Sequence, residues 1–113
     1  MKNIFEEIPG QIPEEIFETI VQASNIKIER IISKGHTTPS KSWYNQNFDE
    51  WVLIIQGAAK INFDNHSQPI SLTKGSYLWI PAKQKHQVIW TPKDVTTIWL
   101  AIHIFKESRT FSH

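Results

Sequence analysis

The sequence contains no cysteine, which excludes disulfide bonds and thiolate metal sites. Any bound metal would therefore have to use nitrogen and oxygen ligands. The sequence also has no excess of charge of one sign, because 12 Lys and Arg stand against 11 Asp and Glu and the formal net charge is +1. This balance gives no indication of nucleic acid or an anionic membrane as a partner.

A long apolar run is absent as well. The first residues, MKNIFEEIPGQIPEEIFE, include four glutamates by Glu15 and resemble neither a signal peptide nor a membrane span. We therefore expect a cytoplasmic protein, and the absence of cysteine fits such a reducing compartment. A chain of 113 residues is long enough for one compact domain with a single core and too short for two ordinary domains.

What the sequence does contain is a series of short segments rich in β-branched and aromatic residues. Turn signals such as Gly57, TKGS and TPKD separate them. Strands at such short spacing are typical of an antiparallel sandwich or barrel. The seven predicted strands are 26–32, 50–56, 58–64, 68–72, 76–81, 86–91 and 96–105.

The segment before these strands has a different pattern. Pro13 followed by two glutamates resembles the first turn of a helix, and the next apolar residues repeat with a helical spacing at Ile16, Phe17, Ile20 and Val21. We predict a short amphipathic helix over residues 13–23. The chain then divides into an N-terminal helical segment packed on a barrel (1–25), the barrel itself (26–106) and a polar tail (107–113).

Two predicted strands are apolar on both faces. WVLII at 51–55 and the segment 98–105 would not leave one face in water, and one short helix cannot cover both. A second copy of the chain is the natural cover, so we predict a homodimer with bulky rings such as Trp51 and Trp99 near its interface.

The spacing of a few turn and polar residues carries a further signal. Glu50 is followed by six residues and Gly57, and Gly75 is followed by five residues and Pro81, with His86 five positions later. In this pairing the chain resembles the cupin superfamily, whose first motif ends with E, six residues and G and whose second begins with G, five residues and PxG. The resemblance covers about residues 35–103 and implies an all-β fold, an antiparallel jelly-roll β-barrel, here with the short N-terminal helix outside it.

The motifs are incomplete at the positions that bind metal in cupins. The two histidines of the first motif are replaced by Tyr44 and Gln46, or by Trp43 and Asn45 if the gap before Glu50 is one residue longer. In the second motif Lys83 stands in place of glycine and Trp90 in place of asparagine. The positions that form turns are retained better than the positions that bind metal.

Two metal-ligand types are retained, and the resemblance implies that Glu50 and His86 point into the barrel from different strands. With the amide oxygen of Gln46 as a third ligand and the Tyr44 hydroxyl as a fourth, they could hold Fe, Mn, Ni or Zn, and a harder metal such as Mn or Fe(II) would suit the set better than copper. The alternative is a hydrogen bond between Glu50 and His86 without metal, or a Glu50 side chain that points to water.

Two other histidines have open roles. His36 follows Gly35 in a loop and could reach the pocket or lie in solvent. His103 lies among apolar residues, where we interpret it as a core or interface histidine that is hydrogen-bonded to a neighbour.

Strand alternation predicts the wall of a ligand pocket around these polar groups. If Glu50 points inward, so do the second and fourth residues after it, and the same holds for His86. Aromatic residues near the two motifs could complete the wall. The predicted pocket residues are Trp43, Val52, Ile54, Trp79, Val88 and Trp90. The alternative is a barrel filled by its own side chains.

Two functions are compatible with the sequence. The first is a metal-dependent cupin enzyme, a class that includes dioxygenases, isomerases, decarboxylases and lyases, with Tyr44 as a ligand or catalytic proton donor. The second is a non-catalytic, metal-free module that binds or senses a small molecule. In both, the partner is a small molecule held in the barrel.

Overall fold

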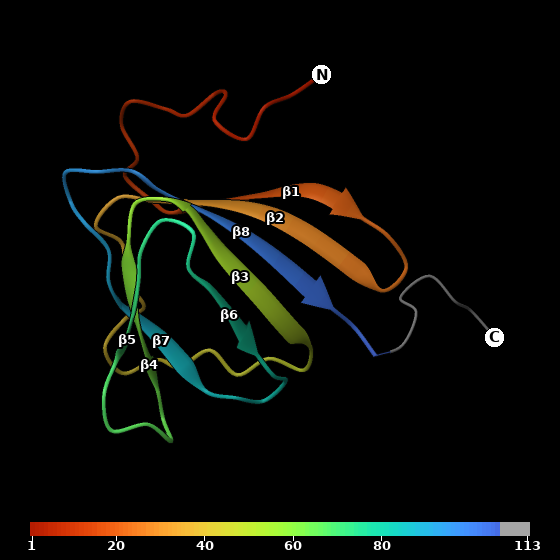
Figure 1. Ribbon diagram of the computed structural model, residues 1–113, viewed down its shortest axis with the longest axis vertical. Coiled ribbons are helices and arrows are strands. Elements are labelled where there is room, and N and C mark those ends of the chain that lie inside the picture. Colours follow the sequence, from red (N-terminus) through yellow and green to blue (C-terminus); the bar gives the residue numbers. More distant parts are fainter. Residues whose placement is uncertain (107–113) are drawn as a thin grey trace.

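The computed structural model describes residues 1–106, which form eight antiparallel strands and no helix. The larger sheet has the order β1-β2-β8-β3-β6 and the smaller sheet the order β5-β4-β7 (Figure 1). No helix among these residues is long and apolar enough to span a membrane. The strands are β1 (Ile16–Gln22), β2 (Ile26–Ser33), β3 (Asp49–Gln56), β4 (Ala59–Phe63), β5 (Ile70–Leu72), β6 (Tyr77–Ile80), β7 (His86–Trp90) and β8 (Thr97–Ile104).

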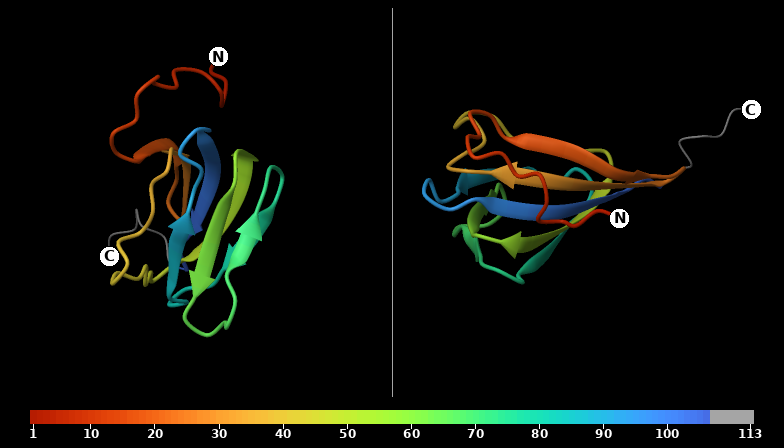
Figure 2. Two further views of the ribbon diagram at one scale, coloured as in Figure 1. Left: turned by 90° about the vertical axis from the view of Figure 1, so that its left-hand side faces the viewer. Right: turned by 90° about the horizontal axis from the view of Figure 1, so that it is seen from above.

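The two sheets face each other with the core between them. The smaller sheet lies against one end of the larger sheet, and the β1–β2 turn extends beyond it, as the views in Figures 1 and 2 show. Strands β2 to β8 coincide with the seven segments predicted from the sequence, and the all-β jelly-roll barrel is confirmed. The buried core consists of Val52, Ile54, Ala59, Ile61, Phe63, Leu72, Ile80, Trp99 and Ala101.

The helix predicted over residues 13–23 is wrong, because this segment contains strand β1, which pairs with β2. A β-bulge explains the misleading pattern. Thr19 pairs with Glu29 and Val21 with Ile28, so Ile20 is an extra residue that reverses the alternation of β1. The apolar pairs Ile16–Phe17 and Ile20–Val21 are four residues apart, which is the spacing of apolar residues on one face of a helix.

The N-terminal segment still covers part of the larger sheet, but in an extended form. Arg30 is only 6% exposed, and its Nη1 donates to the carbonyl oxygens of Ile4 at 2.9 Å and Glu6 at 2.6 Å. Its Nη2 donates to the Glu18 carboxylate at 2.7 Å. The guanidinium therefore joins the segment before β1 to the sheet. The predicted polar tail 107–113 lies outside the described residues.

Two turns at the cupin-like motifs have left-handed backbone conformations. Gly57 has a φ of +88°, and a Cβ atom there would lie 2.5 Å from Thr97 Oγ1, so only glycine fits. Lys83 replaces the glycine of the second motif and keeps a positive φ of 67°. Its amide donates to the Gln46 carbonyl oxygen at 2.6 Å, which fixes the segment that leads into β3.

Candidate functional site

A cavity of about 170 Å³ lies between the two sheets. Its apolar wall comes from both sheets, and its polar groups come from β2, β3, β7, β8 and the segments before β1 and β3. The apolar lining residues are Phe17, Ile31, Val52, Ile61, Ile80, Val88 and Trp99. The polar ones are Glu15, Glu29, Tyr44, Gln46, Glu50, His86 and His103.

Tyr44 is held at the cavity by backbone pairing with the first residue of β7. Its amide donates to the His86 carbonyl oxygen at 2.9 Å, the His86 amide donates back at 3.2 Å, and the two rings stack with centroids 5.3 Å apart. Burial raises the pKa of the Tyr44 hydroxyl, and the negative charges of Glu15 and Glu50 raise it further. The phenol therefore stays protonated at neutral pH.

His86 presents one ring nitrogen to the cavity. Its Nδ1 lies 2.9 Å from the Gln84 carbonyl oxygen, and because a carbonyl can only accept, Nδ1 carries the proton. In the neutral imidazole the lone pair is then on Nε2. The residue is 4% exposed and lines the cavity, so this lone pair is available to a ligand.

Glu50 is 6% exposed, and both of its oxygens already accept hydrogen bonds. Gln46 Nε2 donates to Oε1 at 3.1 Å, and His103 Nε2 donates to Oε2 at 3.0 Å. The structure thus brings Gln46 and Glu50 together on one wall. Glu50 and His86 line the same cavity, yet among the described residues the partners of the Glu50 carboxylate are Gln46 and His103. The hydrogen bond between Glu50 and His86 that the sequence left open is not formed.

His103 is the central polar residue whose role the sequence left open. It pairs with Glu50 across β8 and β3, and its Nε2 also lies 3.6 Å from Glu29 Oε1. The interpretation as a histidine bonded to a neighbour is confirmed. The alternation of Trp99, Ala101 and His103 along β8 is a signal that could have placed it beside the cavity.

A second group of hydrogen-bonded polar side chains lies at the opposite end of the larger sheet, where β2 ends and β8 begins. Ser33 donates its hydroxyl proton to the Glu15 carboxylate and accepts from Trp99 Nε1 at 3.1 Å. Glu15 directly precedes β1, in the segment that was predicted to be helical, and for this reason it was not predicted to lie in the pocket. Glu29 was also missed, because it stands beside Arg30 on β2 and the pattern of this strand does not show which of the two charged side chains faces the cavity.

The predicted pocket residues divide into three groups. Val52 and Val88 line the cavity, and Ile54 is fully buried in the core beneath it. The three tryptophans do not line it and are exposed by 39% at Trp43, 50% at Trp79 and 42% at Trp90.

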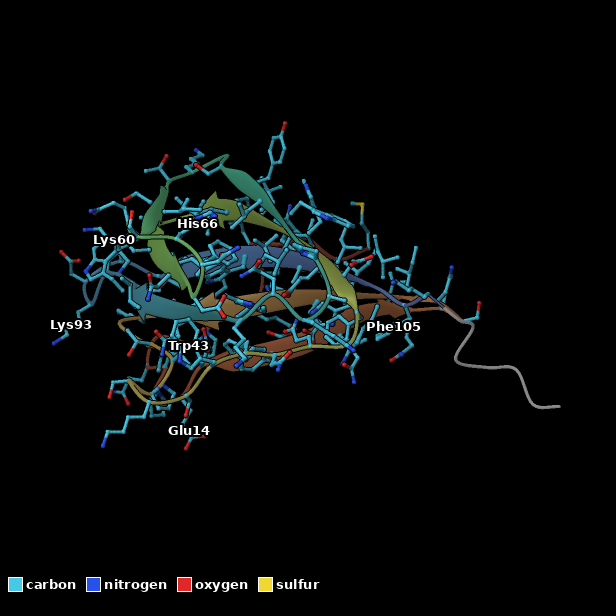
Figure 3. The ribbon with its side chains drawn as sticks, turned by 90° about the horizontal axis from the view of Figure 1, so that it is seen from below. Glu14, Trp43, Lys60, His66, Lys93 and Phe105 are labelled. Carbon is cyan, nitrogen blue, oxygen red and sulfur yellow. The ribbon has the colours of Figure 1, made fainter. Side chains whose placement is uncertain are left out.

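Strand register explains why two of these tryptophans point outward. Glu50 pairs with Ile80, which places Ile80 inside and its neighbour Trp79 outside. Between β4 and β7 the register shifts by one residue, since Ile61 pairs with Val88 but Lys60 pairs with Trp90. This bulge turns Trp90 to the outer face. Lys60 points away from the core, and its Nζ lies 5.5 Å from the Trp90 ring centroid (Figure 3).

His36 has a structural role away from the cavity. Its Nδ1 accepts from the Lys34 amide at 2.9 Å, and its Nε2 lies 3.2 Å from the Pro13 carbonyl oxygen. Both ring nitrogens are therefore used in holding the loop before β1 against the loop after β2, and His36 does not line the cavity.

The donor set does not fit a metal held by Glu50, His86 and Gln46. Each Glu50 oxygen accepts one hydrogen bond and keeps one further acceptor position, but Gln46 turns its amide nitrogen, not its oxygen, toward Glu50. Glu50 and His86 Nε2 are left as two available ligands, whereas catalytic metal sites usually have three protein ligands. Within residues 1–106 no group of three or more His, Cys, Asp or Glu side chains is placed to hold a metal ion.

Comparisons with known proteins agree with this architecture. A protein from Ralstonia eutropha JMP134, provisionally named a mannose-6-phosphate isomerase, is 37% identical, with a TM-score of 0.90 over 93% of this chain and 97% of its own. A cupin superfamily protein from Desulfitobacterium hafniense DCB-2 is 24% identical, with a TM-score of 0.71 over 88% and 84% of the two chains.

A third solved structure shares the fold at lower identity. An RmlC-like cupin from Methanocaldococcus jannaschii, with a double-stranded β-helix fold, is 16% identical, with a TM-score of 0.67 over 87% and 86% of the two chains. No protein-family model and no curated protein sequence matches the chain. The two facing sheets, the retained motif positions and these similarities show that the chain belongs to the cupin superfamily.

Proposed function

We propose that this cupin binds a small molecule in its barrel through its own side chains, without a metal. The observation that carries the proposal is the Glu50 carboxylate, which is buried in the cavity wall and hydrogen-bonded by Gln46 and His103. A buried carboxylate needs such partners, and here hydrogen bonds provide them in place of a cation.

The cavity has the composition of a small-molecule site. An apolar wall surrounds a few convergent polar groups, which is the usual arrangement in such sites. Its volume of about 170 Å³ is below the roughly 300–1,000 Å³ of pockets for drug-sized ligands, so it suits a small ligand. The Tyr44 hydroxyl, which stays protonated, would donate a hydrogen bond to that ligand.

A metal-dependent enzyme is the second candidate, and one observation favours it. Metal-binding histidines commonly donate their other ring proton to a backbone carbonyl, as His86 does to Gln84. This candidate requires a third protein ligand, and Gln46 could serve only by turning its amide oxygen toward the metal. The first candidate requires no such rearrangement, and we therefore prefer it.

A phosphorylated hexose, which the name of the Ralstonia protein suggests, is not the ligand that this cavity favours. Phosphate groups are bound by Arg, Lys, helix N-termini or a metal. None of the described residues that line the cavity is Lys or Arg.

Nuclear magnetic resonance of the indole groups tests the proposal directly. Trp99 lines the cavity and donates from Nε1 to Ser33, whereas Trp79 is exposed on the outer face, so the two indole signals separate cavity binding from surface binding. We expect compounds from a library of small fragments to shift the Trp99 signal and leave the Trp79 signal in place, before and after treatment with a chelator.

A pair of variants in β7 controls this experiment. Val88→Phe adds volume inside the cavity and should abolish the Trp99 shifts, whereas Ile89→Phe adds it at a neighbouring side chain that is 40% exposed and should preserve them. Shifts that survive Val88→Phe, or that chelation removes, would contradict metal-free binding in the cavity.

A further inference from the structure

The polar atoms of the cavity are mainly hydrogen-bond acceptors. Glu15, Glu29 and Glu50 contribute carboxylates, which only accept when ionised, and His86 contributes the lone pair of Nε2. Each carboxylate has about four acceptor positions, and Glu50 uses two of them within the described residues. A ligand that complements these acceptors would therefore carry hydrogen-bond donors.

The net charge of the cavity lining also disfavours an anionic ligand. Three carboxylates line it, and the described lining residues include no Lys or Arg. Lys27 Nζ lies 3.3 Å from Glu29 Oε2, and Arg30 is bound to Glu18 and the N-terminal segment. Even with His103 protonated and Lys27 counted, the carboxylates outnumber the cationic groups. An anion entering this space would meet a net negative charge at low dielectric.

Burial strengthens the electrostatic effect of these carboxylates. The Glu29 and Glu50 side chains are 10% and 8% exposed, so solvent and salt screen them less than surface carboxylates. The raised pKa of Tyr44, to which Glu15 and Glu50 contribute, is consistent with a negative potential at the phenol. The aromatic side chains of Tyr44 and Phe17 also line the cavity, and aromatic rings attract cations.

We infer that the ligand of this cavity is a small organic cation, a protonated amine whose nitrogen donates to acceptor groups of the cavity wall. Phosphate and carboxylate compounds of the same size are excluded by charge and by the shortage of donors. This inference rests on the proposed function, because it names the class of molecule that the cavity holds.

Matched sets of probes test the charge preference. Each set keeps the carbon skeleton and changes the charged group: ethanolamine, ethylene glycol and glycolate; cyclohexylamine, cyclohexanol and cyclohexanecarboxylate; glucosamine, glucose and glucose 6-phosphate. The readout is the Trp99 indole signal of the untagged full chain. We expect an amine to bind at least about tenfold more tightly than its anionic counterpart, the effect of one charged hydrogen bond, and more tightly than its neutral counterpart.

Two adjacent glutamates provide a matched pair of variants. Glu15 lines the cavity, whereas Glu14 is exposed and projects from the edge of the molecule (Figure 3). Glu15→Gln should weaken amine binding by about three- to tenfold, and Glu14→Gln should leave it unchanged. Glu50→Gln should also weaken it, and urea unfolding of each variant reports any loss of the folded state separately.

The outcomes separate this inference from the proposed function. If a neutral or anionic probe shifts the Trp99 signal at lower concentration than its matched amine, the inference is wrong and small-molecule binding stands. If no amine shifts the signal while other fragments do, the inference is also wrong. If neither the matched probes nor the fragment library shifts the signal, the inference and the proposed function both fail.

Discussion

His103 and Glu50 form a half-buried hydrogen-bonded pair across strands β8 and β3, with 3.0 Å between Nε2 and Oε2. The same imidazole nitrogen lies 3.6 Å from Glu29 Oε1, so His103 stands between two buried carboxylates. We expect His103→Ala to lower the free energy of unfolding by roughly 2–4 kcal/mol, because Glu50 loses a charged hydrogen bond and the two carboxylates lose the group between them. Urea unfolding measures this change.

The control for this prediction is a second substitution. Adding Glu29→Gln to His103→Ala should recover part of the lost stability, since it removes one of the two facing charges. Equal stability of His103→Ala and the original chain would show that the pair does not support the fold.

Tyr44 should make stability fall at high pH. Burial, Glu15 and Glu50 raise the pKa of its hydroxyl above the ordinary value of 10.0. The folded state therefore holds the proton more tightly than the unfolded state, and this contribution is complete below pH about 10 and is lost as the pH rises through the folded pKa. Urea unfolding between about pH 9 and pH 11 should show a steeper loss for the original chain than for Tyr44→Phe.

Spectroscopic titration of tyrosinate checks the cause. Glu50→Gln removes one of the negative charges and should lower the pKa of Tyr44, whereas Glu14→Gln, at an exposed site, should not. An unchanged Tyr44 titration in Glu50→Gln would rule out the electrostatic contribution of Glu50.

Lys83 should be less favourable than glycine at its position. A φ of 67° is costly for a side chain with a Cβ atom, and glycine adopts it freely. We expect Lys83→Gly to raise the free energy of unfolding by about 0.5–1 kcal/mol, after the greater entropy of glycine in the unfolded chain is deducted.

Lys85→Gly is the matched control, because Lys85 is an exposed lysine two residues later that is not among the positive-φ residues. That substitution should destabilise the chain by about 0.5–1 kcal/mol. Thermal unfolding of both variants gives the comparison, and a loss of stability in Lys83→Gly would contradict the prediction.

The homodimer remains a prediction, and the structure indicates which surface to test. Trp51 lies on the outer face with its ring 5.7 Å from that of Tyr77, and Tyr77 and Trp79 are 68% and 50% exposed. The expectation for Trp99 was wrong, since it is 4% exposed and lines the cavity. Light scattering should give twice the chain mass of 13.2 kDa, and Trp79→Lys should reduce it.

A substitution elsewhere on the surface controls this experiment. Val95→Lys changes an exposed apolar residue in the loop before β8 and should leave the mass unchanged. A monomer mass for the original chain at micromolar concentration would end the homodimer prediction.

The strands and the motif turns could be predicted because local patterns specify them. Alternation and turn residues gave β2 to β8, and the spacing from Glu50 to Gly57 and from Gly75 to His86 gave the superfamily. Strand β1 could not be predicted in this way, because its bulge at Ile20 imitates a helical repeat and its formation depends on pairing with β2.

The site was predicted only where regular alternation holds. Val52 follows Glu50 by two residues and Val88 follows His86 by two, and both line the cavity. Beyond the bulge in β7 the alternation reverses, and so Trp90 points outward. His103 and Glu29 join the site because β8 lies between β2 and β3, and this strand order is a tertiary feature that single segments do not contain.

Measurement of the metal content together with ligand affinity tests the central claim most directly. The untagged protein, purified without chelator, would be analysed for Fe, Mn, Ni and Zn, and the affinity of the best amine probe would be measured before and after dialysis against a chelator. Because Glu50 and His86 would offer a metal only two protein ligands while Gln46 presents its amide nitrogen, we expect far less than about one equivalent of metal and an unchanged affinity. About one equivalent of metal that Glu50→Gln removes, with ligand binding lost alongside it, would contradict metal-free binding.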